Sequence, residues 1–191
     1  MRCLTLLLAL FLSPLAMADW QLQTDYSRIS FVSVKRGDSA EVQRFTGLTG
    51  VVDAQGGVRI MVPFSGLDSG LALRDERMRN DLFQIARFSD AEVSSQVDLA
   101  TWEALAVGAS KIDTIEFKIS LHGQERRLKA EVLVSRIGEH NMQVSTLEPV
   151  LLKTVDFDLD EGLQRLKEIS AVPDITPEVP VFAVLTFQWH P

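Results

Sequence analysis

Four stretches of this chain alternate between apolar and polar residues with a period of two. Such a period places every second side chain on the same face of a β-strand, so each stretch has a dry face and a wet face. The dry faces consist of Val58, Ile60, Val62 and Phe64; Ala91, Val93, Ser95 and Val97; Ile115, Phe117, Ile119 and Leu121; and Leu128, Ala130, Val132 and Val134. One dry and one wet face is typical of antiparallel sheet that is covered on one side. The sequence therefore predicts a mainly β fold.

The strand-like stretches follow one another closely, which indicates a closed architecture. Compact turns at 54–57 and 122–124 join them, and the sequence has no internal repeat, linker or second domain. We predict about eight strands in a single antiparallel, lipocalin-like, up-and-down β-barrel, because closure removes exposed edge strands. A barrel of this size either fills with side chains or holds one small ligand. Gly47 and Gly50 are candidates for sharp bends of a strand around the barrel.

Two short helices are expected to interrupt the strands. The segment 65–83 passes from a polar turn into a charged run, with Met78, Leu82 and Phe83 on its apolar side. A helix this short is marginal alone and should form only by docking onto something larger. The second predicted helix covers 159–170, with Asp158 as N-cap and Glu161 completing a capping box. Its apolar side consists of Leu159, Leu163, Leu166 and Ile169, which would cover apolar surface such as a barrel mouth.

The final strand-like stretch, Val179–Trp189, is apolar on both of its faces. A strand of this kind is either buried on both sides or lies at an interface between molecules. A homodimer formed through this strand is therefore one open interpretation.

Residues 1–18 have the features of a secretory signal peptide. Met1-Arg2 supplies a positive start, 4–12 is a short apolar run, and Ala16-Met17-Ala18 is a cleavage signal. The apolar run is shorter than the roughly 20 residues that span a bilayer, which disfavours the alternative of an uncleaved anchor. We therefore predict cleavage after Ala18, a periplasmic protein without stable membrane insertion, and one domain over 19–191.

Charge and ligand chemistry exclude several classes of function. The net charge is −7, and loss of residues 1–18 removes only one charged residue, Arg2, so it becomes −8. An acidic chain disfavours nucleic acid as a partner, and equally disfavours docking onto anionic lipid. His122, His140 and His190 lack partners at metal-ligand spacing and are expected to be solvated, and the single cysteine lies within the leader. No metal or cofactor is therefore expected.

Catalytic signatures are also missing from the sequence. It has no G-x-S-x-G elbow, and the acidic cluster at 156–161 lacks the spacing of a calcium-binding loop. We therefore expect a protein that is not an enzyme, although a triad that forms only in space remains the alternative.

Several short motifs resemble, in their order and spacing, the YceI-like family of secreted bacterial barrels that bind polyisoprenoid lipids. They are Trp20-Gln21-Leu22 with Ile29-Ser30-Phe31, the run 45–50 (FTGLTG), the run 65–83, Leu121-His122-Gly123, the run 149–158 (PVLLKTVDFD) and Val179-Pro180-Val181. The resemblance covers residues 20–189. One departure is Asp158, which stands where many relatives carry a glycine after the phenylalanine.

The pattern alone favours a packed core, whereas the resemblance implies a long apolar tunnel. On that basis the tunnel wall would be formed by Phe31, Phe45, Ile60, Val62, Phe117, Ile119, Val132, Met142 and Val144. Arg74, Arg77 and Arg79 are the candidates for contact with a lipid head group, because an arginine fork suits phosphate. The competing interpretation makes 74–79 a solvated helix with internal ion pairs.

The resemblance implies a non-catalytic periplasmic binding protein for an isoprenoid or similar long-chain amphiphile. One alternative is a structural or stress-response dimer in the cell envelope, with a filled barrel. Another is an accessory enzyme linked to a quinone, which would need a polar residue inside the barrel. The alternation described above places almost none there.

Overall fold

The computed structural model describes residues 19–35, 39–170 and 174–191 of the chain. The predicted signal peptide, 1–18, lies outside the described residues. No helix in the described ranges is both long enough and apolar enough to cross a membrane.

Within the described residues, twelve strands form one sheet in which every pairing is antiparallel. They are β1 (Asp19–Leu22), β2 (Arg28–Lys35), β3 (Ser39–Phe45), β4 (Thr49–Val52), β5 (Gly57–Pro63), β6 (Leu67–Asp68), β7 (Asp90–Gln96), β8 (Ser110–Leu121), β9 (Gln124–Gly138), β10 (Asn141–Thr146), β11 (Val150–Lys153) and β12 (Glu178–His190). The helical segments are α1 (Ala72–Arg77), α2 (Leu99–Glu103), α3 (Asp160–Ser170), the π-helical turn η3 (Met78–Leu82) and the 3₁₀ turns η1 (Thr24–Tyr26), η2 (Phe64–Gly66) and η4 (Thr154–Phe157).

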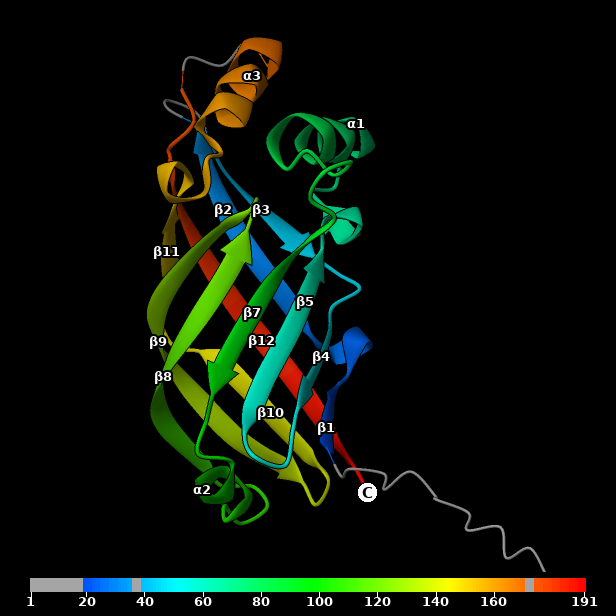
Figure 1. Ribbon diagram of the computed structural model, residues 1–191, viewed down its shortest axis with the longest axis vertical. Coiled ribbons are helices and arrows are strands. Elements are labelled where there is room, and N and C mark those ends of the chain that lie inside the picture. Colours follow the sequence, from blue (N-terminus) through cyan, green and yellow to red (C-terminus); the bar gives the residue numbers. More distant parts are fainter. Residues whose placement is uncertain (1–18, 36–38, 171–173) are drawn as a thin grey trace, which may run out of the picture.

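The sheet closes on itself through β12 (Figure 1). One edge of β12 pairs with β1 and β2, and its other edge pairs with β10 and β11. Four positions in the barrel wall are each occupied by two short strands placed end to end, namely β1/β2, β3/β4, β5/β6 and β10/β11. Single strands occupy the other four positions, namely β7, β8, β9 and β12, so the barrel has eight strand positions. The predicted antiparallel eight-stranded barrel is therefore confirmed. Gly47, with a φ of 71°, sits at the break between β3 and β4, where the predicted bend occurs.

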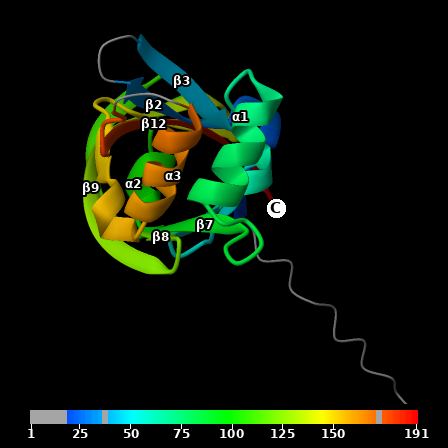
Figure 2. The ribbon, with the colours of Figure 1, turned by 90° about the horizontal axis from the view of Figure 1, so that it is seen from above.

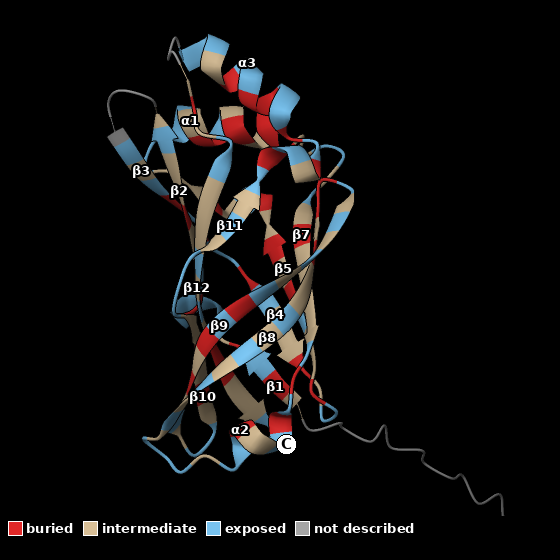
Figure 3. Cartoon of the chain, turned by 90° about the vertical axis from the view of Figure 1, so that its left-hand side faces the viewer, coloured by how far each residue is buried: buried red, intermediate tan, exposed pale blue. Residues whose placement is uncertain are grey.

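The alternation seen in the sequence sorts side chains between the barrel interior and the solvent. Ile60, Val93 and Ile119 are neighbours in register on β5, β7 and β8, and all three line the interior of the barrel. Figure 3 shows exposed and less exposed residues following one another along the strands. On β12, Val184 does not line the cavity and is 41% exposed, and Phe182 is 39% exposed. The expectation that this strand is buried on both sides is therefore wrong for the single chain, while an interface there stays a prediction.

The helices lie at the two ends of the barrel. Figure 2 looks down the barrel and shows α1 and α3 side by side across one end, here called the upper end, and Figure 1 shows α2 at the opposite, lower end. The close approach of α3 to η3 requires a glycine, because a Cβ on Gly162 would lie 2.5 Å from the carbonyl oxygen of Asp81. The sequence predicted two of these helices and missed α2, which is only five residues long.

The first predicted helix docks through its apolar side, as expected. Met78, Leu82 and Phe83 are all buried. The ring of Phe83 stacks on Phe64 at 4.5 Å and meets Phe45 edge-on at 5.8 Å between ring centroids. Because Phe45 and Phe64 belong to the barrel, these aromatic contacts hold α1 and η3 over its upper end.

The second helix differs from its prediction at both ends. It begins at Asp160, and Asp158 is not its N-cap but a left-handed residue with a φ of 53° that ends η4. Glycine adopts this backbone conformation without strain, and among other residues short polar ones such as aspartate tolerate it best. The Asp158 carboxylate also accepts a hydrogen bond from Gln124 at 2.5 Å. At the other end, Ile169 is 44% exposed, whereas the preceding leucines of its apolar side are buried.

The left-handed conformation of Asp158 can be tested by substitution. We expect Asp158→Gly to change the free energy of unfolding by less than about 1 kcal/mol, because relief of strain offsets the lost hydrogen bond. Asp158→Val should cost roughly 2 kcal/mol, since a β-branched side chain clashes in this conformation. Chemical denaturation followed by circular dichroism measures both variants. Equal destabilisation by glycine and valine would show that backbone strain is not what this position carries.

Candidate functional site

The interior of the barrel contains a cavity of about 700 Å³. It opens at the upper end, where Leu71 and Leu73 of the α1 region and Ile169 of α3 line the cavity and are also exposed to solvent. The barrel is therefore not filled with side chains, which removes the filled-barrel form of the alternative function.

Apolar side chains from strands all around the barrel form most of the cavity wall. Eight of the nine residues predicted for a tunnel wall lie on it, namely Phe31, Phe45, Ile60, Val62, Phe117, Ile119, Val132 and Val144. The ninth, Met142, is buried but does not line the cavity. Val134 on the neighbouring strand β9 behaves in the same way, so this part of the barrel is packed core.

The lower end of the cavity is closed by Trp102 of α2. Its side chain is 4% exposed and lines the cavity, and its indole Nε1 donates to the Asp113 carboxylate at 2.8 Å. Asp98 caps this short helix by accepting from the backbone N–H of Thr101. Sequence reasoning missed the helix, although Asp98 followed by apolar residues at 99 and 102 is a signal that could have indicated it.

Charged side chains gather at the cavity mouth. The Glu41 carboxylate on β3 accepts from the Lys35 ammonium at 3.1 Å and from the Arg74 guanidinium at 2.9 Å. Lys153 also lines the cavity and pairs with Glu178 at 3.6 Å. Arg74 thus forms an ion pair across to the barrel, so the predicted ion-paired surface helix is wrong for this residue.

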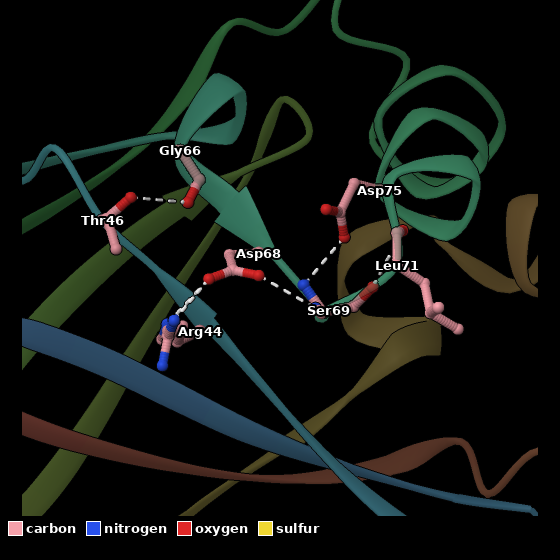
Figure 4. Close-up of polar contacts among 8 residues, drawn as sticks. Arg44, Thr46, Gly66, Asp68, Ser69, Leu71 and Asp75 are labelled. Atoms are coloured by element: carbon pink, nitrogen blue, oxygen red, sulfur yellow. Dashed lines mark hydrogen bonds and ion pairs between the residues drawn. The ribbon is translucent and has the colours of Figure 1, made fainter.

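A network of hydrogen bonds fixes the turn that leads into α1 (Figure 4). Asp68 accepts from the backbone N–H of Gly70 at 2.9 Å and from the Arg44 guanidinium at 2.6 Å. The hydrogen bond from the Gly70 backbone N–H has the largest effect and the bond from Arg44 the next largest, and together they lower the pKa of Asp68 below its usual range. The buried Asp75 accepts from the backbone N–H of Ser69 at 2.8 Å, so it anchors the start of the helix rather than facing solvent.

The three arginines proposed for head-group contact occupy different environments. Arg74 lines the cavity and is paired with Glu41. Arg77 lines the cavity, and no ion pair or hydrogen bond of its side chain is found among the described residues. Arg79 does not line the cavity, and its guanidinium donates to the carbonyl oxygen of Ser65 at 3.3 Å. Of the three, Arg77 is thus the arginine that lines the cavity and has no side-chain partner among the described residues.

Polar residues do project into the upper part of the barrel, which the sequence interpretation did not expect. Ser33 of β2 and Gln43 of β3 lie on the cavity wall. The alternation that predicted an almost entirely apolar interior was drawn from β5, β7, β8 and β9, and β2 and β3 do not follow it. The signal was present in the sequence, because Glu41 and Gln43 share the face of Phe45.

The remaining chemistry expected from the sequence was tested against the structure. His122 is 8% exposed, so the prediction of three solvated histidines is wrong here; His140 and His190 are exposed. The ring of His122 packs on Phe88, and its Nδ1 lies 3.1 Å from the carbonyl oxygen of Phe157. Within the described ranges, no group of three or more histidine, cysteine or acidic side chains could hold a metal ion.

Comparisons with known proteins agree with this architecture. The family model for the YceI-like domain matches residues 20–187. No curated protein matches the sequence. A solved polyisoprenoid-binding domain from Saccharophagus degradans, implicated in plant cell wall breakdown, is 30% identical with a TM-score of 0.86. The alignment covers 88% of this chain and 97% of that domain.

A second solved structure, BcnA from Burkholderia cenocepacia, is 17% identical with a TM-score of 0.66. The alignment covers 86% of this chain and 98% of that protein. A likeness at this level of identity shows that the fold is shared.

Proposed function

We propose that this chain, which belongs to the YceI-like family, binds an isoprenoid or similar long-chain amphiphile inside its barrel. The observation that carries the proposal is the apolar cavity of about 700 Å³, open at one end and closed by Trp102 at the other. Ligand cavities in proteins measure about 300–1,000 Å³ and are mostly apolar with a few polar groups. The Saccharophagus degradans relative, described as polyisoprenoid-binding, supports the same ligand class.

The apolar wall supplies the affinity in this proposal. Each buried CH₂ group contributes roughly 0.8 kcal/mol, so a chain of several isoprene units offsets its own ordering. Phe31, Phe45, Ile60, Val62, Phe117, Ile119, Val132 and Val144 would contact this chain, and Met142 would only support the wall from behind. The polar end of the ligand would lie in the upper part of the cavity, and Arg77, which lines the cavity at the mouth, is the arginine available to a head group that extends that far.

We further propose a role in binding alone, performed after export and cleavage at Ala18 by the domain 19–191. The support for a non-catalytic role is the composition of the cavity wall, which is mostly apolar and carries its charged side chains near the mouth. The support for a periplasmic location is the leader sequence.

Binding of the C20 alcohol geranylgeraniol tests this proposal. Of the three tryptophans, only Trp102 lines the cavity, so it reports on occupancy through its fluorescence. We expect saturable binding of one alcohol per protein, with a change in Trp102 emission that is absent in the Trp102→Phe variant. Titration that shows no saturable binding by fluorescence or calorimetry would contradict the proposal.

A further inference from the structure

The neighbouring strands β2 and β3 line the cavity with side chains whose polarity falls from the mouth inward. Their register pairs Ser33 with Glu41 and Phe31 with Gln43. The side-chain contacts run diagonally to this register and form three levels from the mouth towards the floor. Lys35 bonds to Glu41 in the first level, Gln43 bonds to Ser33 in the second, and the rings of Phe31 and Phe45 stack in the third. An amphiphile placed along these strands has its polar end beside the second level.

Gln43 is the residue of this series whose hydrogen bonding is incomplete. Its side chain is 1% exposed, and its Nε2 donates to the hydroxyl oxygen of Ser33 at 2.8 Å. Its Oε1 has no hydrogen-bond partner in the part of the chain that the structure describes. A buried amide oxygen without a donor is unfavourable. Among the described residues, the side-chain amide of Gln43 bonds only to a neighbouring serine on the same wall, so it links no other element of the fold.

The charges nearest to Gln43 are already paired. Glu41 holds both Lys35 and Arg74, so an anionic head group at this depth would have to displace an existing carboxylate. The unpaired Arg77 belongs to α1 at the mouth, above the strand position of Gln43. An uncharged oxygen needs no such displacement, because it can form a hydrogen bond with the unpartnered end of the Gln43 amide.

We propose that Gln43, oriented by Ser33, is a specificity-determining subsite for an uncharged oxygen at the polar end of the bound chain. The group recognised is a hydroxyl or a carbonyl rather than a phosphate. Rotation of the amide about its terminal bond presents either Oε1 to a hydroxyl or Nε2 to a carbonyl, and Ser33 can donate or accept in response. This inference rests on the proposed function and specifies its ligand class.

The test compares four C20 probes: geranylgeraniol, its aldehyde, its phosphate and the hydrocarbon phytane. They are titrated into the wild-type protein and Gln43→Met, which keeps the length of the side chain and removes its hydrogen bonds. We expect Gln43→Met to weaken binding of the alcohol, the aldehyde or both by roughly tenfold. Binding of phytane should be unchanged or tighter. The phosphate should bind wild type more weakly than the alcohol does.

Stability separates recognition from a structural role. If Gln43 serves the ligand, Gln43→Met should leave the Tm of the ligand-free protein unchanged or raised, since an unsatisfied buried oxygen is removed. The double variant Ser33→Ala/Gln43→Met removes both partners and serves where the single variant folds poorly. Gln143→Met is the matched control, because it makes the same chemical change at a glutamine that does not line the cavity and whose Nε2 donates to the hydroxyl oxygen of Thr186 at 3.3 Å.

Each outcome decides the matter. A selective loss of alcohol or aldehyde binding in Gln43→Met, but not in Gln143→Met, supports the subsite. An equal loss of phytane binding, or a lower Tm with unchanged affinities, overturns the subsite and makes Gln43 a structural residue. Unchanged alcohol binding with an unchanged Tm also overturns it and indicates that the amide oxygen bonds to a water molecule. Tighter binding of the phosphate also overturns it. Failure of the wild type to bind even phytane would instead refute the proposed function.

Discussion

Ile119→Trp is expected to abolish lipid binding while leaving the ligand-free barrel folded. Ile119 lies on β8 and lines the cavity wall, so the added ring would enter the space that the chain of the ligand occupies. Displacing about one five-carbon unit removes roughly 4 kcal/mol of apolar burial, which corresponds to about a thousandfold loss of affinity. In a packed core the same change would cost about 1–3 kcal/mol of stability. In this cavity the Tm of the ligand-free protein should be unchanged or raised.

Ile112→Trp is the matched control for this experiment. It makes the same chemical change on the same strand, but Ile112 is 58% exposed and points away from the cavity. We expect it to bind geranylgeraniol as the wild type does. A lower Tm for ligand-free Ile119→Trp with unchanged binding would mean that the space around Ile119 is not used by the ligand.

Trp102→Ala is expected to cause the largest loss of stability among the substitutions considered. The indole is buried, closes the floor of the cavity and bonds to Asp113 across to β8. Truncating a buried tryptophan costs about 3–5 kcal/mol, which lowers the Tm of a domain of this size by roughly 6–20 °C. Differential scanning calorimetry of the ligand-free protein measures this change.

Trp102→Phe separates the floor from its hydrogen bond. Phenylalanine keeps most of the apolar volume and loses the donor to Asp113, so we expect a cost of about 1 kcal/mol and a Tm lower by roughly 2–4 °C. If the alanine and phenylalanine variants were equally destabilised, the hydrogen bond rather than the packing would hold α2 in place.

The fold was predictable because most of its information is local. Alternation in β5, β7, β8 and β9 assigns each side chain to one face of the sheet. Closure of the sheet into a barrel is then expected, because it removes the exposed edge strands that an open sheet would have. The docking side of α1 and η3 was equally readable, since Met78, Leu82 and Phe83 share one side. By contrast, the five residues of α2 carry too little periodicity to be distinguished from a loop.

The cavity wall was predictable in its apolar part and not in its polar part. An inward apolar residue in the middle of a strand is expected to face the cavity. The prediction was wrong for Met142 only because packing in three dimensions decides where the cavity ends. The pairing of Glu41 with Lys35 and Arg74, and the free end of Gln43, depend on residues from β2, β3 and α1 meeting in space. A pattern along one strand does not contain this information.

Native mass spectrometry of the protein purified from its own cells without detergent tests the central claim most directly. Three proteins are compared: the wild type, Ile119→Trp and Ile112→Trp. We predict that the wild type and Ile112→Trp carry an added mass that organic solvent releases as one long-chain lipid, and that Ile119→Trp carries none. A wild type that shows only the mass of its polypeptide would contradict the claim that this barrel holds a lipid.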